Sequence, residues 1–300
     1  MKRVLAPVFW GGWMMVLILD CRTALSGAAE GVALCLRTLI PGLFPFFVLS
    51  TMLTASLPKG GLLVAGILGG YPVGARNAAI AWRDGRLNKE EAERMAVLCN
   101  CAGPSFIFGA TGNLHPWLLW AVYLFSVAAL WLVMPKCTPA PIMTKPQSLP
   151  DAVFSAVKAL VGVCGWVILA RTLLAVLDRW VLWMLPDWGQ ALAGGILELT
   201  NGILSLDNQE YAFVLAAGML GFGGLCVMMQ TASVTRGLSL RYYFPGKLFQ
   251  SCVCMTAAAL VQRTTLPLWF WGSLLMTGSI CAVILRKSEI RYGNPVAVGV

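Results

Sequence analysis

The stretch Gly69-Gly70-Tyr71-Pro72-Val73-Gly74-Ala75-Arg76-Asn77 interrupts one long apolar segment of the chain, and Cys99-Asn100-Cys101-Ala102-Gly103-Pro104-Ser105-Phe106 interrupts the next. Glycine and proline together end or unwind a helix. Lipid cannot pair the backbone groups released at such a break, so the break must be buried in protein or line a cavity. In transporters, interrupted helices mark substrate sites near the membrane midplane. The alternative is that both stretches are loops at the membrane edge.

The composition is that of a membrane protein. Of the 300 residues, 58% are hydrophobic and 12% are charged, and the mean hydropathy is +0.76, which excludes an ordinary soluble domain. The chain also holds 12 Trp, 31 Gly and 16 Pro, residue types that are enriched at membrane interfaces or in membrane helices. At about 20 apolar residues per span, there is room for roughly seven to nine spans plus shorter half-helices. We therefore expect an all-α polytopic membrane protein.

The net charge of +9 is spread over single basic residues between apolar segments, which indicates positive-inside topology rather than nucleic-acid binding. The ends Met1-Lys2-Arg3 and Arg286–Arg291 are both expected to be cytoplasmic, which makes the number of spans even. Residues 4–20 are expected to be a retained first span, because no small-x-small cleavage site follows them.

The first half predicts several further elements. A helix is expected over 23–40, with Pro41 ending it, and residues 61–69 are too few for more than a half-helix. The charged stretch 83–94 is expected to be a solvated helix start on the cytoplasmic side, with Asn88 as its N-cap. A full span is expected over 114–134.

Residues 135–150 contain five prolines and divide the chain into two halves. Spans in the second half are expected near 152–178, 188–206, 209–229, 244–262 and 266–285. The expected organisation is an N-terminal span (1–22), a first repeat (23–134), a Pro-rich linker (135–150), a second repeat (151–285) and a basic cytoplasmic tail (286–300).

The two halves show signs of an internal repeat. An offset of 129 residues aligns Val32 with Val161, Cys35 with Cys164, Gly60 with Gly189, and Gly66-Ile67-Leu68 with Gly195-Ile196-Leu197. The first break then falls on Glu198–Gly202, and after a shift of eight residues the second falls on Gly221–Cys226 and Gln230. Two related halves with discontinuous helices, broken or re-entrant, in matching places are typical of transporters.

Several motifs resemble the YlbJ-type sporulation integral membrane proteins. They are TLIPGLFPFFVLSTML (38–53), GILGGYPVGARNA (66–78), LNKEEAERM (87–95), CNCAGPSFIFGATG (99–112) and, in the second half, FGGLCVMMQ (222–230). The resemblance covers about residues 23–285 and places the chain with the nucleoside-recognition, or Gate domain, group, whose relatives include nucleoside transporters and the gates of ferrous-iron permeases. It implies a multi-pass protein of a bacterial cytoplasmic membrane and a role in spore cortex formation.

The chain departs from the usual motifs of that family at three positions. Gly69 stands where Ser is common, Cys101 where a second Asn is common, and Cys226 where Ser is usual. Each change removes a hydrogen-bonding group from the supposed site. The solute is therefore expected to differ from that of the family or to be lost.

The candidate substrate-binding residues lie at the breaks. Asn100 can contact a ligand or cap broken backbone; Tyr71 can stack on a ring or anchor at the interface; Ser105 follows a half-helix start that attracts electron-rich groups. Glu198 is either a coupling or cation-binding carboxylate or a hydrated surface residue. The full set is Gly70, Tyr71, Pro72, Gly74, Asn100, Gly103, Pro104, Ser105, Glu198, Thr200, Asn201, Gly223, Gly224 and Gln230.

The sequence contains few residues that could support enzymatic catalysis. The single His115 precedes Pro116 at a span edge, and the sequence contains no catalytic triad order, H-E-x-x-H, P-loop or dinucleotide motif. The two C-x-C pairs lack the spacing and partners of a zinc site, so neither a metal nor a cofactor is expected. Apart from the lipid bilayer, the candidate partners are a small polar solute or ion, a second copy of the chain, and other sporulation membrane proteins.

These observations predict a permease or gate for a small polar solute, either nucleoside-like or an ion. The alternative is a non-transporting membrane component of a sporulation assembly, for which the charged stretch 83–94 would be the docking surface. A polar cavity that joins the four breaks would favour transport, whereas a tightly packed apolar centre would favour the assembly component.

Overall fold

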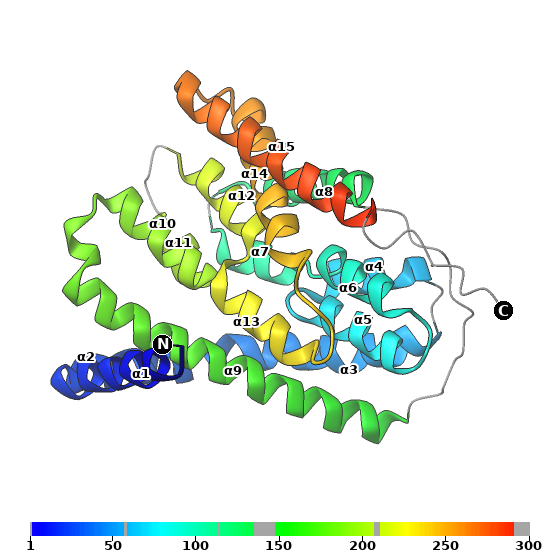
Figure 1. Cartoon of the computed structure of the whole chain (residues 1–300), viewed down its shortest axis with the longest axis horizontal. Coiled ribbons are helices and arrows are strands. Elements are labelled where there is room, and N and C mark those ends of the chain that lie inside the picture. Colours follow the sequence, from blue (N-terminus) through cyan, green and yellow to red (C-terminus); the bar gives the residue numbers. More distant parts are fainter. Residues whose placement is uncertain (1, 57–58, 113, 135–147, 207–210, 291–300) are drawn as a thin grey trace.

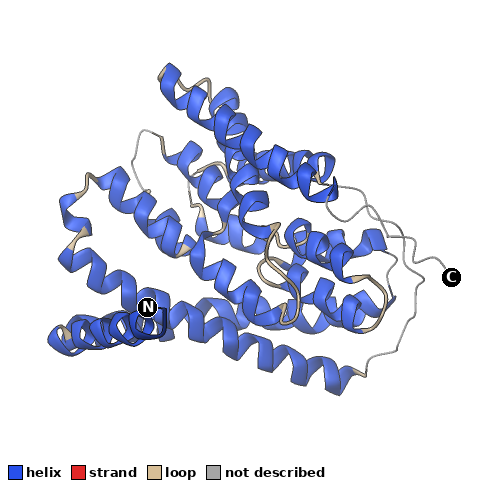
Figure 2. Ribbon diagram, in the orientation of Figure 1, coloured by secondary structure: helices blue, strands red, loops and turns tan. Residues whose placement is uncertain are grey.

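The computed structural model describes the chain except for residues 1, 57–58, 113, 135–147, 207–210 and 291–300. Within the described part, every regular element is helical (Figure 1, Figure 2). The helices are α1 (Lys2–Leu19), α2 (Cys21–Leu34), α3 (Ile40–Ser56), α4 (Lys59–Gly69), α5 (Val73–Arg83), α6 (Lys89–Leu98), α7 (Pro104–Ala110), α8 (Pro116–Val133), α9 (Leu149–Trp180), α10 (Asp187–Leu197), α11 (Leu199–Leu204), α12 (Ala212–Phe222), α13 (Gly224–Val234), α14 (Tyr243–Val261) and α15 (Leu268–Ile290).

Among the described residues, six apolar helical segments are long enough to cross a membrane, which confirms the prediction of an all-α polytopic membrane protein. They are Cys21–Leu53, Pro116–Val133, Leu149–Trp180, Ala212–Val234, Tyr243–Val261 and Leu268–Arg286. Six is fewer than the seven to nine expected, because α4 to α7 and α10 to α11 are helices of 11 residues or fewer. The N-terminal segment is helical as α1, but its described apolar part is only Trp10–Leu19, so a first span at 4–20 stays a prediction.

The prediction that Pro41 ends a helix is wrong. The chain remains helical from α2 through α3, and a π-helical turn at Cys35–Leu39 joins the two. Proline removes one backbone donor and crowds the carbonyl group four residues earlier, which here belongs to Arg37 in that turn. The wider π turn accommodates the ring without ending the helix.

The two halves present their long helices to each other. The segment formed by α2 and α3 packs along α9 and runs in the opposite direction (Figure 1). At this contact the Sγ of Cys35 lies 3.7 Å from the carbonyl oxygen of Cys164, the residue aligned with it by the offset of 129. Most of the predicted linker lies outside the described residues, and α9 begins within it at Leu149. The other domain boundaries stay predictions.

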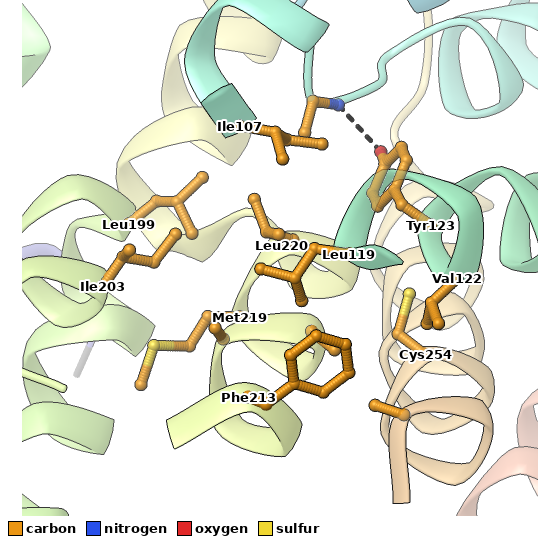
Figure 3. Packing of buried hydrophobic residues seen from close by; sticks show 14 of the residues in the cluster. Ile107, Leu119, Val122, Tyr123, Leu199, Ile203, Phe213, Met219, Leu220 and Cys254 are labelled. Atoms are coloured by element: carbon orange, nitrogen blue, oxygen red, sulfur yellow. Dashed lines mark hydrogen bonds between the residues drawn. The ribbon is translucent and has the colours of Figure 1, made fainter. Parts of the chain in front are cut away.

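The largest hydrophobic core lies where the two halves meet. Figure 3 shows side chains of α7 and α8 packed against side chains of α11 and α12. Ile107, Leu119 and Tyr123 come from the first half, and Leu199 and Leu220 come from the second; all five are at most 2% exposed. The interrupted segments are therefore enclosed by protein rather than by lipid, as the cost of unpaired backbone requires.

Glycines allow the breaks to pack backbone against backbone. An ideal Cβ added at Gly66 or at Gly74 would overlap the carbonyl oxygen of Cys99. The helices on both sides of the first break, α4 and α5, therefore lie directly against the second break. Any larger residue at Gly66 or Gly74 would push these segments apart.

We expect Gly74→Ala to destabilise the protein by about 1–3 kcal/mol or more, because the added methyl group overlaps fixed backbone. Gly162→Ala is the matched control: Gly162 lies within α9 with no atom within 4 Å of the added Cβ, so this change should be neutral or stabilise by up to about 1 kcal/mol. Unfolding of both variants in detergent micelles measures the difference. Equal stability of the two variants would contradict the close packing at Cys99.

Candidate functional site

The two breaks of the first half lie against each other. Helix α4 ends at Gly69 and α5 begins at Val73, while α6 ends at Leu98 and α7 begins at Pro104. Gly70 has a φ of +77°, a conformation that favours glycine, and a Cβ added to it would lie 3.2 Å from the amide nitrogen of Gly103. Pro104 occupies the first turn of α7, as the sequence predicted.

The two breaks of the second half repeat this relation. Helix α10 gives way to α11 at Glu198, and α12 gives way to α13 at Gly223. Gly223 and Gly224 have φ values of +82° and +81°. A Cβ added to Gly224 would lie 3.0 Å from the carbonyl oxygen of Gly195 and 3.4 Å from the amide nitrogen of Leu199. The predicted breaks at Glu198–Gly202 and Gly221–Cys226 are thus both present, and they touch.

Breaks from both halves meet around a cavity of about 60 Å³. Its polar lining residues are Glu198, Thr200 and Gln230, and the glycines of the first-half breaks, Gly70 and Gly103, also line it. Apolar side chains of α3, α7, α9 and α13 complete the wall. The lining residues are Leu39, Leu43, Gly69, Gly70, Tyr71, Gly103, Phe106, Val163, Val167, Glu198, Leu199, Thr200, Val227 and Gln230.

Only part of the predicted site lines the cavity. Six of the predicted residues line it: Gly70, Tyr71, Gly103, Glu198, Thr200 and Gln230. Seven others lie near the breaks but outside the lining: Pro72, Gly74, Asn100, Pro104, Asn201, Gly223 and Gly224. Ser105 lies in α7, and its side chain is outside the described part of the structure.

The Glu198 carboxylate is buried, with 4% of the residue exposed, so the alternative of a hydrated surface residue is wrong. It accepts hydrogen bonds from the amide groups of Thr200 at 3.1 Å and Asn201 at 2.8 Å, which makes it the N-cap of α11. Asn201 does not line the cavity; its side-chain oxygen accepts a hydrogen bond from Arg171, which forms an ion pair with Glu30 at 2.8 Å. Glu198 therefore lines the cavity and also caps a half-helix.

Asn100 is fully buried and belongs to a polar layer beside the cavity. Its amide group donates to Thr231 Oγ1 at 3.0 Å and to the Tyr243 hydroxyl at 2.5 Å. Its backbone carbonyl accepts from Lys247 Nζ at 2.5 Å, and the same ammonium group donates to Gln250 Oε1 at 2.8 Å. The Asn100 side chain thus bonds to two side chains of the second half, and its role as a ligand contact or a backbone cap stays a prediction.

Tyr71 connects this polar layer to the cavity. Its ring lies 5.6 Å from Lys247 Nζ, and its hydroxyl donates to the carbonyl oxygen of Leu220 at 2.6 Å. The Tyr123 hydroxyl lies 3.3 Å from the Tyr71 hydroxyl and accepts from the amide group of Ala102 at 2.8 Å. Two tyrosines thus pair backbone groups released by one break in each half.

The charged stretch is not the solvated helix start that was predicted. Asn88 is the N-cap of α6, as expected, and its side chain accepts from the amide group of Glu91 at 2.8 Å. However, Glu91, Glu93 and Arg94 are 7%, 4% and 5% exposed. The loop that precedes α14 contacts α6 through Ser239 and Arg241, and sequence spacing cannot reveal a contact between segments so far apart in the chain.

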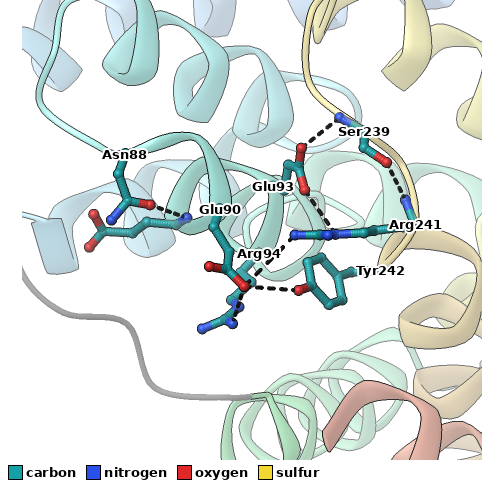
Figure 4. Close-up of polar contacts among 8 residues, drawn as sticks. Asn88, Glu90, Glu93, Arg94, Ser239, Arg241 and Tyr242 are labelled. Carbon is teal, nitrogen blue, oxygen red and sulfur yellow. Dashed lines mark hydrogen bonds and ion pairs between the residues drawn. The ribbon is translucent and has the colours of Figure 1, made fainter. Parts of the chain in front are cut away.

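This contact forms a charged cluster between the halves (Figure 4). Glu93 pairs with Arg241 at 3.1 Å and accepts from the amide group of Ser239 at 2.9 Å. Glu90 accepts from Arg94 at 2.7 Å and from the Tyr242 hydroxyl at 3.2 Å. We refer to Glu90, Glu93, Arg94, Arg241 and Tyr242 as the α6 cluster.

The sequence-based prediction missed Lys247 and Gln250, which are 1% and 0% exposed. The available signal was a lone lysine inside the span predicted at 244–262, since an ionisable residue within a span is a functional hypothesis by default. It also missed Arg76, which is 3% exposed and donates to the hydroxyls of Thr51 and Ser155, both at 2.5 Å.

The fold and this site define an all-helical, multi-pass membrane protein whose centre is built from interrupted helices. The chain is similar to the sporulation integral membrane protein YlbJ of Bacillus subtilis (strain 168), with 24% identity over 325 aligned positions that cover 83% of this chain and 80% of that protein. This similarity confirms the YlbJ-type resemblance indicated by the motifs, whereas the Gate domain grouping stays a prediction. Searches found that no family model and no solved structure match the chain.

We expect the Glu93 and Arg241 side chains to be energetically coupled. In a double-mutant cycle with Glu93→Ala and Arg241→Ala, the coupling free energy should be about 0.5–3 kcal/mol. Glu93→Ala should be the more damaging single change, because it also leaves the amide group of Ser239 unpaired. Denaturant unfolding in micelles measures the four stabilities.

The control cycle replaces Glu93→Ala by Asp187→Ala, a change of an exposed acid in the first turn of α10. This pair should be additive within about 0.3–0.5 kcal/mol. Additivity of Glu93 and Arg241 to the same degree would show that the α6 cluster does not hold the halves together.

Proposed function

We propose that this protein is a permease or gate for a small polar solute, most readily an ion, in the cytoplasmic membrane of a spore-forming bacterium. The observation that carries the proposal is the cavity at which breaks from both halves meet, with Glu198, Thr200 and Gln230 in its wall. The similarity to YlbJ supports a sporulation context, and we extend it to spore cortex formation. The chemistry is binding and passage rather than catalysis.

The size of the cavity favours an ion over a nucleoside. A cavity of about 60 Å³ has room for a few water molecules or a partly dehydrated ion. Pockets for drug-sized organic ligands are commonly about 300–1,000 Å³. A nucleoside-like solute would need a conformation with a much wider site.

The chemistry of the wall favours a hard monovalent cation or a proton. Glu198 supplies the carboxylate, and Thr200 and Gln230 supply neutral oxygen atoms. Hard cations take oxygen ligands, and carboxylates inside membranes commonly serve ion and proton pathways. Glu198 is therefore our candidate for the residue that binds or couples the ion.

We also propose that the two halves are inverted repeats. The order of broken helices is the same in each half, and equivalent breaks make equivalent contacts: Gly70 with Gly103, and Leu199 with Gly224. The aligned residues Cys35 and Cys164 touch between helices that run in opposite directions. A two-fold axis between antiparallel spans lies in the membrane plane, which is the symmetry of many alternating-access transporters.

The alternative, a non-transporting component of a sporulation assembly, loses part of its support. Its docking surface would be the stretch 83–94, but the α6 cluster turns the charges of Glu93 and Arg94 inward. The alternative remains an outcome of the experiment below.

We expect a small monovalent cation to raise the apparent Tm of the detergent-purified protein in a saturable way, because a ligand that binds only the folded state stabilises it. Each kcal/mol of binding should raise Tm by about 2–4 °C. Na⁺, Li⁺ and K⁺ are compared with choline at constant ionic strength, and nucleosides and nucleobases are tested in parallel. Glu198→Gln should abolish the cation response, and the same ions should cross proteoliposome membranes only with the parent protein.

The matched control is Asp187→Asn, an exposed acid at the start of the same short helix that leads to Glu198, and it should respond like the parent. A saturable shift with a nucleoside, but with no cation, would assign the larger solute instead. If no compound changes Tm and no ion flux appears, the protein is better described as an assembly component.

A further inference from the structure

Lys247 is a buried cation that pairs with uncharged groups. Lys247 lies near the start of α14 and is 1% exposed. Its ammonium group donates to the carbonyl oxygen of Asn100 at 2.5 Å and to Gln250 Oε1 at 2.8 Å. The face of the Tyr71 ring lies 5.6 Å away. Among the described residues, no carboxylate forms an ion pair with Lys247.

The groups around this ammonium are those that bind a free monovalent cation. Backbone carbonyl and amide oxygens replace the hydration shell of alkali ions in selective sites, and an aromatic face adds a cation–π contact. The carbonyl of Asn100 also lies just beyond the C-terminal end of α6, where the helix dipole favours positive charge. Both the ligand set and the local field therefore suit a cation of charge +1.

Both residues that supply these oxygens, Asn100 and Gln250, make further hydrogen bonds that do not involve Lys247. The Gln250 amide group donates to Ser126 Oγ at 3.2 Å, which orients its Oε1 toward the ammonium. The Asn100 side chain is fixed by Thr231 and Tyr243. The site is therefore preorganised by its surroundings, as a binding site for a free ion would be.

We propose that the ammonium group of Lys247 is a tethered cation that occupies a monovalent-cation site at the end of α6. The first-half break then needs no free ion, because the chain supplies its own positive charge. The second-half break differs, because Glu198 places a carboxylate there, beside the cavity. This inference does not rest on transport; it concerns how the break is held.

The test removes the tethered cation and offers a free one. In Lys247→Ala, the oxygens remain and the ammonium is gone, so Na⁺, K⁺ or ethylammonium should raise the apparent Tm by several degrees relative to choline, with saturation. All variants carry Glu198→Gln, so that the cation response proposed for the cavity is absent and the two proposals are tested separately. The Glu198→Gln protein that retains Lys247 should show no response.

Two controls define the outcome. Lys247→Met fills the space with an uncharged chain of similar length and should not respond to any cation. Adding Gln250→Leu to Lys247→Ala removes one oxygen ligand and should reduce or abolish the response. If Lys247→Ala is monodisperse only when KCl or ethylammonium chloride is present during purification, that rescue supports the site equally.

The inference is overturned if Lys247→Ala responds no more than Lys247→Met, or if it yields no monodisperse protein in any of these salts. Either result would mean that the oxygens around Lys247 cannot hold a free cation, so that the lysine is a structural hydrogen-bond donor only.

Discussion

The structure depends on one constraint: backbone groups released by helix breaks inside a membrane must find partners within the protein. Each unpaired buried group costs about 1–3 kcal/mol, and four breaks release many of them. Two charged side chains pair some of these backbone groups. The Glu198 carboxylate accepts the amide groups at the start of α11, whereas the Lys247 ammonium donates to the carbonyl group of Asn100 beyond the end of α6. Tyr71 and Tyr123 pair further backbone groups in the same region.

The same constraint explains why glycines gather at the centre. A carbonyl group at a break can be enclosed only if neighbouring backbone comes close, and Gly66 and Gly74 allow this at Cys99. Close packing in turn limits the space that remains. The breaks of both halves meet around a cavity of about 60 Å³. The same packing arrangement thus places buried charged groups at the breaks and leaves only a small cavity between them.

Charged side chains connect the two halves at two places. The α6 cluster joins the first half to the loop before α14 through the oppositely charged Glu93, which is buried, and Arg241, which is partly exposed. Lys247 lies farther along α14, in a layer of neutral oxygens and aromatic faces. The outer contact is an ion pair in which only Arg241 is partly exposed, whereas the inner contact is a buried ammonium group bound to neutral oxygens.

The sequence by itself determined the class of the protein and the positions of its breaks. Apolar length specifies membrane spans, and glycine with proline specifies where a helix stops, since both are local properties of the chain. Yet Pro41 lies in a continuous helix, because the preceding π turn accommodates its ring. Only the tertiary structure decided which breaks share a cavity and that Glu93 is buried. It also decided that Lys247 donates a hydrogen bond to the carbonyl group of Asn100, 147 residues away along the chain. Such contacts depend on how distant helices pack, and no local pattern records them.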